Sequence, residues 1–392
     1  MKIIVVSGVA LCTNPRVVKE ADALAALGHE VTVVAALTDP SRQEDERRTT
    51  QGKTWQPLYL FDITNKGLRN RLYWLAIRIR RRLGIELGRR LGIRNHWELG
   101  YFVPELNSYC ATEKADLFSL HNEGGLWVGT RLLRDKRNIS IDFEDWYSEN
   151  QAMHPDEYLK SMERMVLTHC AFSTTTSKAL AVALSTEFNC PAPVVIYNTF
   201  PVIDSRPGHI VSGRLSVCWF SQTIGPGRGL ERLINTIENM DGNIELHLIG
   251  KPSSASYLEA LMGDKAYIQQ HNLVAPDHLG RLLQSFDVGF AGELTTPPSR
   301  DLTIANKVFQ YLASGLPVIA SNTSGQREIA EELTDCIRIF HDDKGLRDSL
   351  AYWRNPEHLE FGQEAAHDAA THRYNSHESY RVLENLLDTL RL

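Results

Sequence analysis

Residues 306–321 constrain the fold of this chain most, because a short helix there runs through a glycine directly into a buried strand. Val308 and Leu312 are one helical turn apart and so share a face. Gly315 is placed to end the helix, and residues 316–320 form an unbroken apolar run suited to a parallel strand. A helix that feeds a central strand in this way predicts an open α/β sheet.

Length and composition suit two globular domains. The chain has 392 residues, of which 43% are hydrophobic and 23% are charged, so each domain can bury a sizeable core. Six cysteines form no C-x-x-C pair and no cluster at zinc-binding spacing, which fits a reducing cytoplasm without disulfides or structural metal. No apolar run approaches the roughly 20 residues that cross a bilayer, so any membrane contact would be peripheral.

The first 200 residues alternate strands and helices. We interpret residues 2–6 as a strand rather than part of a signal peptide, and Asn14 followed by Pro15 begins a helix that ends near Gly28. Further strands are expected at residues 29–34, 116–120, 139–143, 171–175 and 194–197. A polar stretch with proline and glycine, residues 201–213, then predicts an interdomain linker.

A second cycle of strands and helices follows the linker. It begins with a strand at residues 215–220, a glycine-rich loop at 221–229 and a helix at 230–238, and the next strand, 244–249, ends at Gly250. Three more strands are expected at residues 287–291, 316–320 and 336–340. The last segment, residues 361–392, has the apolar spacing of a helix.

The loop at residues 221–229 predicts an anion cradle. Gly227 and Gly229 let the backbone approach a diphosphate at a helix N-terminus, and Arg228 can contact its oxygens. A tight turn with a solvent-facing arginine is the competing interpretation of this loop. Lys307, near the start of an otherwise apolar helix at the sheet edge, is placed to reach the same anion, although an ordinary exposed lysine is the alternative.

Residues 66–94 form a strongly basic amphipathic segment. They contain one lysine, nine arginines and a single acid, Glu86, for a net charge of +9, so the rest of a chain with net charge −6 carries −15. Aliphatic residues and Trp74 are interleaved with the arginines. This pattern indicates either contact with an anionic membrane surface or lipid phosphate, or a solvated helical hairpin packed on the first domain. The acidic remainder disfavours nucleic acid.

Two of these segments resemble the donor-binding region of the GT-B glycosyltransferases, in particular the family 4 group, also called glycosyl transferases group 1. The likeness rests on Arg228-Gly229 and on residues 305–321, and it extends more weakly over both halves. The resemblance implies an α/β protein with two facing Rossmann-like domains. It places an acceptor-binding domain at residues 1–200, a nucleotide-sugar-binding domain at 213–362, and a C-terminal helix at 363–392 that crosses back to pack on the first domain.

The resemblance also implies roles for individual residues. His121, which matches the second histidine of the family's Asp-x-x-His-x-His segment, is expected to be catalytic together with Arg228 and Lys307. The donor-binding residues are expected to be Gly227, Gly229, Gly250, Glu293, Asn306, Gln310, Gly325 and Gln326, and the acceptor-binding residues Gly8, Arg16 and Asp145. Neither a metal nor a cofactor is expected, and the nucleotide-diphosphate sugar is a co-substrate.

Three positions depart from the family pattern. Thr223 stands where the family often has a second phosphate-binding arginine, and Gln310 stands where a glutamate commonly binds the ribose. The partner glutamate, eight residues before Gln310, would fall on Leu302, so we expect Glu293 to act in its place through a longer loop, although a solvated loop acid is an equal alternative.

The expected function is transfer of a sugar from a nucleotide sugar to a glycan, lipid-linked or small-molecule acceptor, with retention, in polysaccharide or glycoconjugate biosynthesis. The expected location is cytoplasmic, with possible membrane association through residues 66–94. A GT-B sugar-nucleotide epimerase and a non-catalytic nucleotide-sugar-binding homologue remain alternatives. The sequence leaves the base, the sugar, the acceptor and the oligomeric state open.

Overall fold

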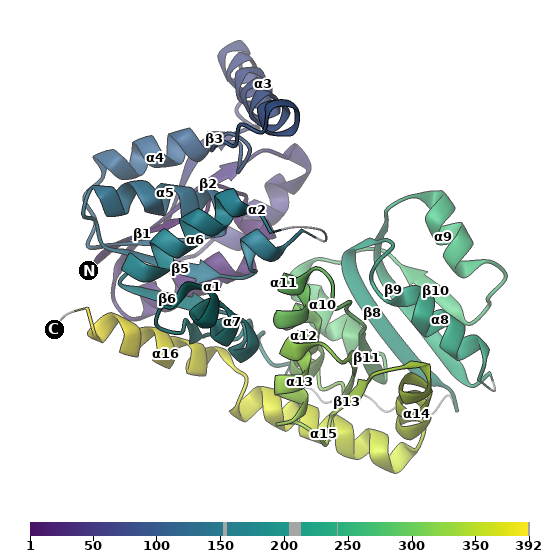
Figure 1. Ribbon diagram of the computed structural model, residues 1–392. Helices are drawn as coiled ribbons and strands as arrows, with labels where there is room; N and C mark the ends of the chain where they lie inside the picture. The colour runs from purple at the N-terminus through teal and green to yellow at the C-terminus, as the bar shows by residue number, and fades with distance from the viewer. Residues whose placement is uncertain (152–154, 204–212, 241, 391–392) are drawn as a thin grey trace. The chain divides into compact units, whose positions relative to one another are not determined.

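The computed structural model describes residues 1–151, 155–203, 213–240 and 242–390, and these residues form two compact units (Figure 1). The first unit comprises Met1–Thr176, Ala181–Ile196 and Ser379–Leu392, and the second comprises Ser177–Leu180 and Tyr197–Glu378. Most of the expected linker, residues 204–212, lies outside the described residues. No helix within the described ranges is both long enough and apolar enough to span a bilayer.

The first unit is built on a parallel sheet with the strand order β3-β2-β1-β4-β5-β6-β7. Its strands are β1 (Lys2–Val6), β2 (Glu30–Leu37), β3 (Gln56–Asp62), β4 (Leu117–Leu120), β5 (Ile139–Phe143), β6 (Phe172–Thr175) and β7 (Val194–Val195). The inner strands are almost continuously buried, because helices cover both faces of a doubly wound sheet. The order reverses between β1 and β4, and open α/β sheets bind ligands at the carboxyl ends of the strands on either side of such a reversal.

Helices surround this sheet. They are α1 (Pro15–Ala26), α2 (Gln43–Thr50), α3 (Leu68–Leu91), α4 (Val103–Thr112), α5 (Asn122–Arg134), α6 (Glu157–His169), α7 (Lys178–Phe188) and α16 (Ser376–Asp388). Asn14 caps α1 through its side chain, and Pro15 occupies the first helical position, as the sequence predicts. Leu383 and Leu387 of α16 belong to the same core as β1 and α1, which ties the end of the chain to the first unit.

The second unit repeats the design with the strand order β10-β9-β8-β11-β12-β13. Its strands are β8 (Leu215–Ile224), β9 (Ile244–Pro252), β10 (Ile268–His271), β11 (Val288–Ala291), β12 (Val318–Ser321) and β13 (Ile337–Phe340). Its helices are α8 (Leu230–Glu238), α9 (Ala255–Met262), α10 (Pro276–Leu283), α11 (Pro298–Leu302), α12 (Asn306–Ala313), α13 (Ser324–Ala330), α14 (Asp343–Trp353) and α15 (Pro356–His372). Here the order reverses between β8 and β11.

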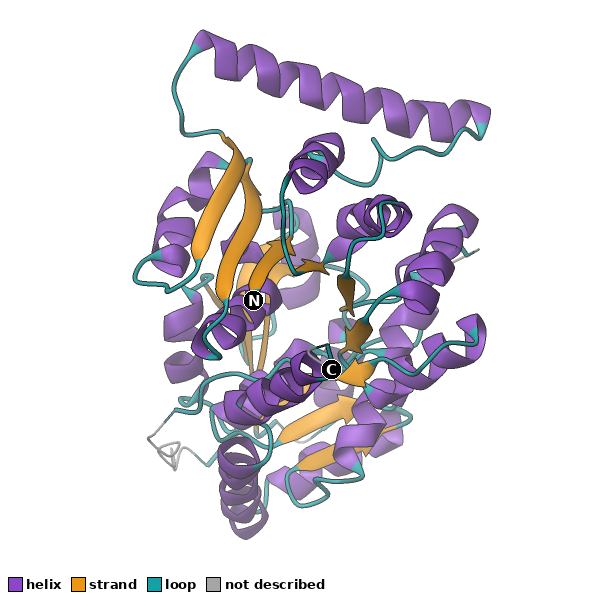
Figure 2. Cartoon of the chain, turned by 90° about the vertical axis from the view of Figure 1, so that its left-hand side faces the viewer, coloured by secondary structure: helices purple, strands orange, loops and turns teal. Residues whose placement is uncertain are grey.

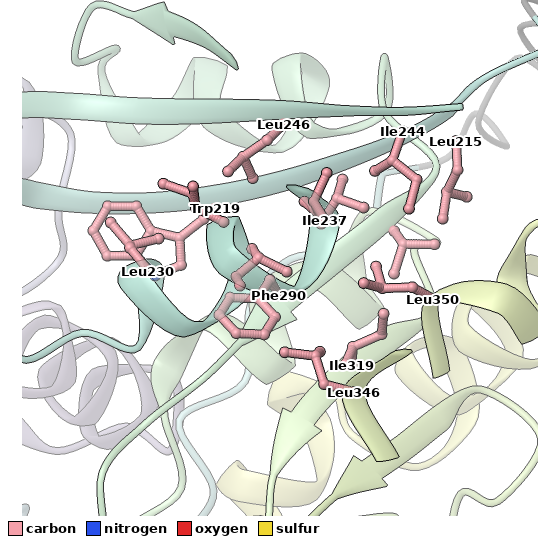
Figure 3. Packing of buried hydrophobic residues seen from close by; sticks show 14 of the residues in the cluster. Leu215, Trp219, Leu230, Ile237, Ile244, Leu246, Phe290, Ile319, Leu346 and Leu350 are labelled. Carbon is pink, nitrogen blue, oxygen red and sulfur yellow. The ribbon is translucent and has the colours of Figure 1, made fainter. Parts of the chain in front are cut away.

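Apolar side chains from the strands and helices of the second unit fill its core (Figure 3). Trp219 of β8 and Leu230 of α8 are fully buried in this cluster, where they join Phe290 of β11. Burial of so large an apolar surface fixes the ends of β8 and β11, and with them the loops that leave these strands.

Two elements differ from the sequence prediction. The expected loop from residue 221 begins later, because β8 continues to Ile224 through an irregular register with β9. The last segment is two helices rather than one, since the helix breaks between His372 and Ser376. Ala366 and Ala370 of α15 pack in the core of the second unit, so the return to the first unit that we expected from residue 363 begins only at Ser379.

Candidate donor and acceptor sites

Two loops meet at the switch point of the second sheet, where open α/β sheets bind ligands. The loop after β8 leads through Gly229 into α8, and the loop after β11 begins with Gly292. Gly229 has a φ of 74°, and a Cβ atom there would lie 2.4 Å from the carbonyl oxygen of Gly292. Only glycine allows this backbone contact, which brings the two loops together.

Lys307 and Glu293 form an ion pair beside these loops. Lys307 Nζ donates a hydrogen bond to Glu293 Oε1 at 2.8 Å, and the two side chains are only 11% and 10% exposed. The same Nζ lies 5.5 Å from the centre of the Trp219 ring. Burial alone would raise the pKa of Glu293, but the charge and hydrogen bond of Lys307 outweigh it, and the pKa is lowered.

The charges of three cationic side chains act on the Glu293 carboxylate, and one of them, Lys307, contacts it directly. Arg228 and Arg300 also lower the pKa of Glu293 through their charges, after the larger effects of burial and Lys307. Arg300 Nη1 donates to the carbonyl oxygen of Gly227 at 3.2 Å, which links α11 to the predicted anion cradle. With one carboxylate against three cations, this group favours a further anion.

A hydrogen-bonded network behind Glu293 connects it to α13. The amide N–H of Glu293 donates to Ser321 Oγ at 2.8 Å, and Gln326 Nε2 donates to both the carbonyl oxygen and Oγ of Ser321 at 3.0 Å. Gln326 Oε1 is buried and accepts no hydrogen bond from any described residue. Gly325 packs so closely that a Cβ atom would lie 2.4 Å from the carbonyl oxygen of Thr303.

Three other predicted donor residues have structural contacts of their own. Asn306 Oδ1 accepts a hydrogen bond from Asn198 Nδ2 at 2.9 Å. Gln310 is buried and lies against Gly280 of α10. At Gly250, with a φ of 151°, a Cβ atom would lie 2.3 Å from the carbonyl oxygen of Ser221, so this glycine permits the close approach of β8 and β9.

In the first unit, His121 follows β4 at the switch point and is fully buried. Its Nε2 lies 2.5 Å from Glu20 Oε2, while Ser119 Oγ donates to Glu20 Oε1 at 2.5 Å. Its Nδ1 lies 3.8 Å from Asp142 Oδ2 and 3.7 Å from Glu144 Oε1. Burial opposes the charged ring, but Glu20, Glu144 and Asp142 together raise the pKa of His121 to about 10. At neutral pH the ring is therefore an imidazolium.

Arg16 holds Asp142 in this cluster. Its Nε and Nη2 donate to the two carboxylate oxygens of Asp142 at 2.5 and 2.6 Å, and its Nη1 donates to the carbonyl oxygen of Ile196 at 2.6 Å. Both Arg16 and Asp142 are buried. The guanidinium that we expect to bind acceptor thus also connects α1 to the end of β5 through Asp142.

His121, Asp142 and Glu144 have ligand atoms within 4.8 Å of one another, a spacing at which three residues could hold a metal ion. A metal would require His121 to lose its proton and would compete with the Arg16 guanidinium for the Asp142 carboxylate. Burial would raise the pKa of Asp142, but Arg16 lowers it, so the carboxylate is already neutralised by a permanent cation. The chemistry of the donor set therefore fits a metal poorly.

The two remaining predicted acceptor residues lie at other strand ends of the first unit. Gly8 follows β1 with a φ of 71°, and a Cβ atom there would lie 2.6 Å from Leu106 Cδ1. Asp145 follows β5, is partly exposed, and lies three residues beyond Asp142.

Sequence reasoning missed Glu20, Trp219 and Arg300 as site residues. Glu20 lies one turn after Arg16 on α1, a spacing that places both side chains on one face, so this signal was present. Trp219 lies in an apolar strand, and nothing in the sequence distinguishes it from the other core residues there. Arg300 depends on the path of the long loop after β11, which no short motif determines.

Comparison with solved structures identifies the architecture. A sucrose-phosphate synthase from Thermosynechococcus elongatus is 15% identical, with a TM-score of 0.71 over 100% of this chain and 99% of that one. HepE from Anabaena, solved with UDP and glucose, is 14% identical, with a TM-score of 0.71 over 99% of this chain and 100% of that one. The chain has the GT-B glycosyltransferase fold. TarM from S. aureus, solved as a mutant with fondaparinux, α-GlcNAc-glycerol and UDP, shares this GT-B fold at 11% identity and a TM-score of 0.69, over 98% and 99% of the two chains.

A family comparison agrees with this GT-B assignment. Residues 215–351 match the model of the glycosyl transferases group 1 family, which confirms the resemblance expected from the sequence. The matched segment contains the loop after β8, Glu293 and α12. No curated protein matches the chain by sequence.

Proposed function

We propose that this protein transfers a sugar from a nucleotide-diphosphate sugar to a glycan, lipid-linked or small-molecule acceptor. The observation that carries the proposal is the buried Lys307–Glu293 ion pair at the switch point of the second sheet, together with the charges of Arg228 and Arg300 that act on the same carboxylate. The diphosphate is the anion that such a group suits. Two solved structures with this fold hold UDP, which supports a nucleotide as the ligand.

The proposed chemistry is electrostatic and needs no metal. As the bond between sugar and diphosphate breaks, negative charge develops on the leaving phosphate oxygens, and Arg228, Lys307 and the free amides at the start of α8 stabilise it. Glu293 keeps Lys307 extended before donor binds. We further propose that the anomeric configuration is retained. We also propose a cytoplasmic location, because the six free cysteines suit a reducing compartment.

Residues of the first unit are proposed to serve the acceptor and the transferred sugar. His121 is the proposed contact for the sugar, as a charged donor held by Glu20. Gly8, Arg16 and Asp145 are the proposed acceptor contacts, and Arg16 also holds the Asp142 carboxylate. Gly227, Gly250, Asn306, Gln310, Gly325 and Gln326 complete the proposed donor-binding set.

A panel of UDP, GDP and dTDP sugars tests this function. Purified protein is first screened for a ligand-induced rise in thermal midpoint and then for nucleotide release with and without glycan and lipid-linked acceptors. We expect one nucleotide class to stabilise the protein and to be released only in the presence of acceptor. Conversion of the donor without acceptor would indicate an epimerase. Stabilisation by a nucleotide without any turnover would indicate a binding protein. No response to any nucleotide would contradict the proposal.

A further inference from the structure

Helix α3 lies at the margin of the first unit and is packed on one face only (Figures 1 and 2). On its inner face, Ile77 is buried and Trp74 stacks on Phe61 with ring centres 5.2 Å apart. Arg80 also points inward, where Nη1 and Nη2 donate to the Glu105 carboxylate at 2.8 and 2.7 Å. These contacts hold the helix firmly while its opposite face remains uncovered.

The outer face carries a row of exposed aliphatic side chains. They follow one another at intervals of four, three, four and four residues, which keeps them on one side of the helix. The row consists of Leu68, Leu72, Leu75, Ile79 and Leu83, each between 51% and 74% exposed. It extends over roughly 22 Å at 1.5 Å per residue. Exposed apolar side chains that gather on one surface in this way are typical of interaction sites.

Arginines border the aliphatic row. Arg71, Arg78, Arg82 and Arg89 follow at intervals of seven, four and seven residues and so form a parallel row beside it. Glu86 is the single acid in residues 66–94, and its carboxylate already accepts hydrogen bonds from Arg89 and Arg90 at 2.7 Å. The outer face is therefore apolar at its centre and cationic at its edge.

We propose that the outer face of α3 docks this protein on a bilayer that contains anionic lipids. The aliphatic row enters the boundary between headgroups and acyl chains, and the bordering arginines reach the lipid phosphates. A second copy of the chain fits this face less well, because it would offer the arginines no free acid: Glu86 is already paired with Arg89 and Arg90. The chain as a whole is acidic, so the attraction is confined to this helix.

Vesicle co-sedimentation of the full chain tests the proposal, with phosphatidylcholine vesicles prepared with and without phosphatidylglycerol. We expect binding to the anionic vesicles, little binding to the neutral ones, and release as the salt concentration rises. The double variant Leu75→Gln/Ile79→Gln should weaken the partition roughly tenfold or more, because two exposed aliphatic side chains no longer enter the lipid. Arg78→Gln/Arg82→Gln should remove the preference for anionic vesicles.

Matched controls test whether the loss of binding is specific to α3 or follows from making any exposed apolar position polar. Val182→Gln and Phe361→Gln change comparably exposed apolar residues on α7 and α15 and should leave vesicle binding unchanged. The α3 variants should keep the thermal midpoint and the response to nucleotide sugars of the native chain. Failure of the membrane proposal can therefore be told apart from failure of the proposed function. Absence of vesicle binding, or a solution dimer that the Leu75→Gln/Ile79→Gln variant disperses, would overturn the proposal.

Discussion

Lys307 and Glu293 show how a charged site is prepared at the scale of single residues. Removing both charges from water is costly, and such a pair often contributes little to stability. Lys307 was recognisable in the sequence from its place on an apolar helix. Its pairing with Glu293 was not, because the two lie 14 positions apart, with irregular chain and the short helix α11 between them. The pair instead keeps a cation extended where an anion is proposed to bind.

His121 provides a prediction about pH at the same scale. Its pKa is raised from 6.5 to about 10 by Glu20, Glu144 and Asp142, against the effect of burial. A raised pKa means that the interaction stabilises the fold fully below pH 6.5 and is lost as the pH rises toward 10. The quantity to compare is the difference in unfolding free energy between the native chain and His121→Gln. We expect this difference to shrink by on the order of a few kcal/mol as the pH rises across this range.

Urea unfolding of both proteins from pH 6.5 to 10 measures this difference. Comparison with the variant is needed because burial and the charge of Arg16 lower the pKa of Lys19 to about 7, which makes a pH contribution of opposite sign in both proteins. A difference that stays constant across the range would show that His121 is not charged in the folded state.

At the scale of secondary structure, periodicity and capping residues predicted most of the elements. The helix expected at residues 230–238 and the strand at 139–143 have those bounds in the structure, because clear apolar patterns meet glycine and polar stops. Strand β3 and helix α11 were not predicted, since short segments with mixed polarity depend on their neighbours for stability. The helix that carries the candidate residues Asn306, Lys307 and Gln310 was accordingly predicted, while α11, which carries Arg300, was not.

Gly229 provides the prediction for the elements around the donor site. In Gly229→Ala the new Cβ atom would lie 2.4 Å from the carbonyl oxygen of Gly292, so the loops after β8 and β11 must separate. The alanine would also be strained by the φ of 74°. We expect a loss of more than about 2 kcal/mol in stability together with weakened nucleotide binding. Gly242→Ala is the matched control, since its φ is 66° and no atom lies within 4 Å. Equal effects of the two substitutions on thermal unfolding and nucleotide binding would show that the contact with Gly292 is unimportant.

For the whole molecule, the two units repeat one sheet design but carry different charged groups at their switch points. The first unit places a protonated histidine among carboxylates after β4. The second places one carboxylate after β11, in contact with Lys307 and under the charges of Arg228 and Arg300. All of the proposed phosphate-binding residues belong to the second unit. The sequence predicted His121 for the first unit and Arg228 and Lys307 for the second. It did not predict Glu20 and Arg300, because they join these groups through tertiary contacts.

The dissociation constant of the nucleoside diphosphate, measured by calorimetry for Arg228→Ala and Lys307→Met, tests the central claim most directly. Each variant loses a charged contact worth about 1.5–3 kcal/mol, so each dissociation constant should rise roughly tenfold or more. Lys344→Met, which removes an exposed lysine of the same unit, should bind like the native chain. Native affinity in both the Arg228→Ala and Lys307→Met variants would contradict the account, because the cations around Glu293 would then hold no phosphate.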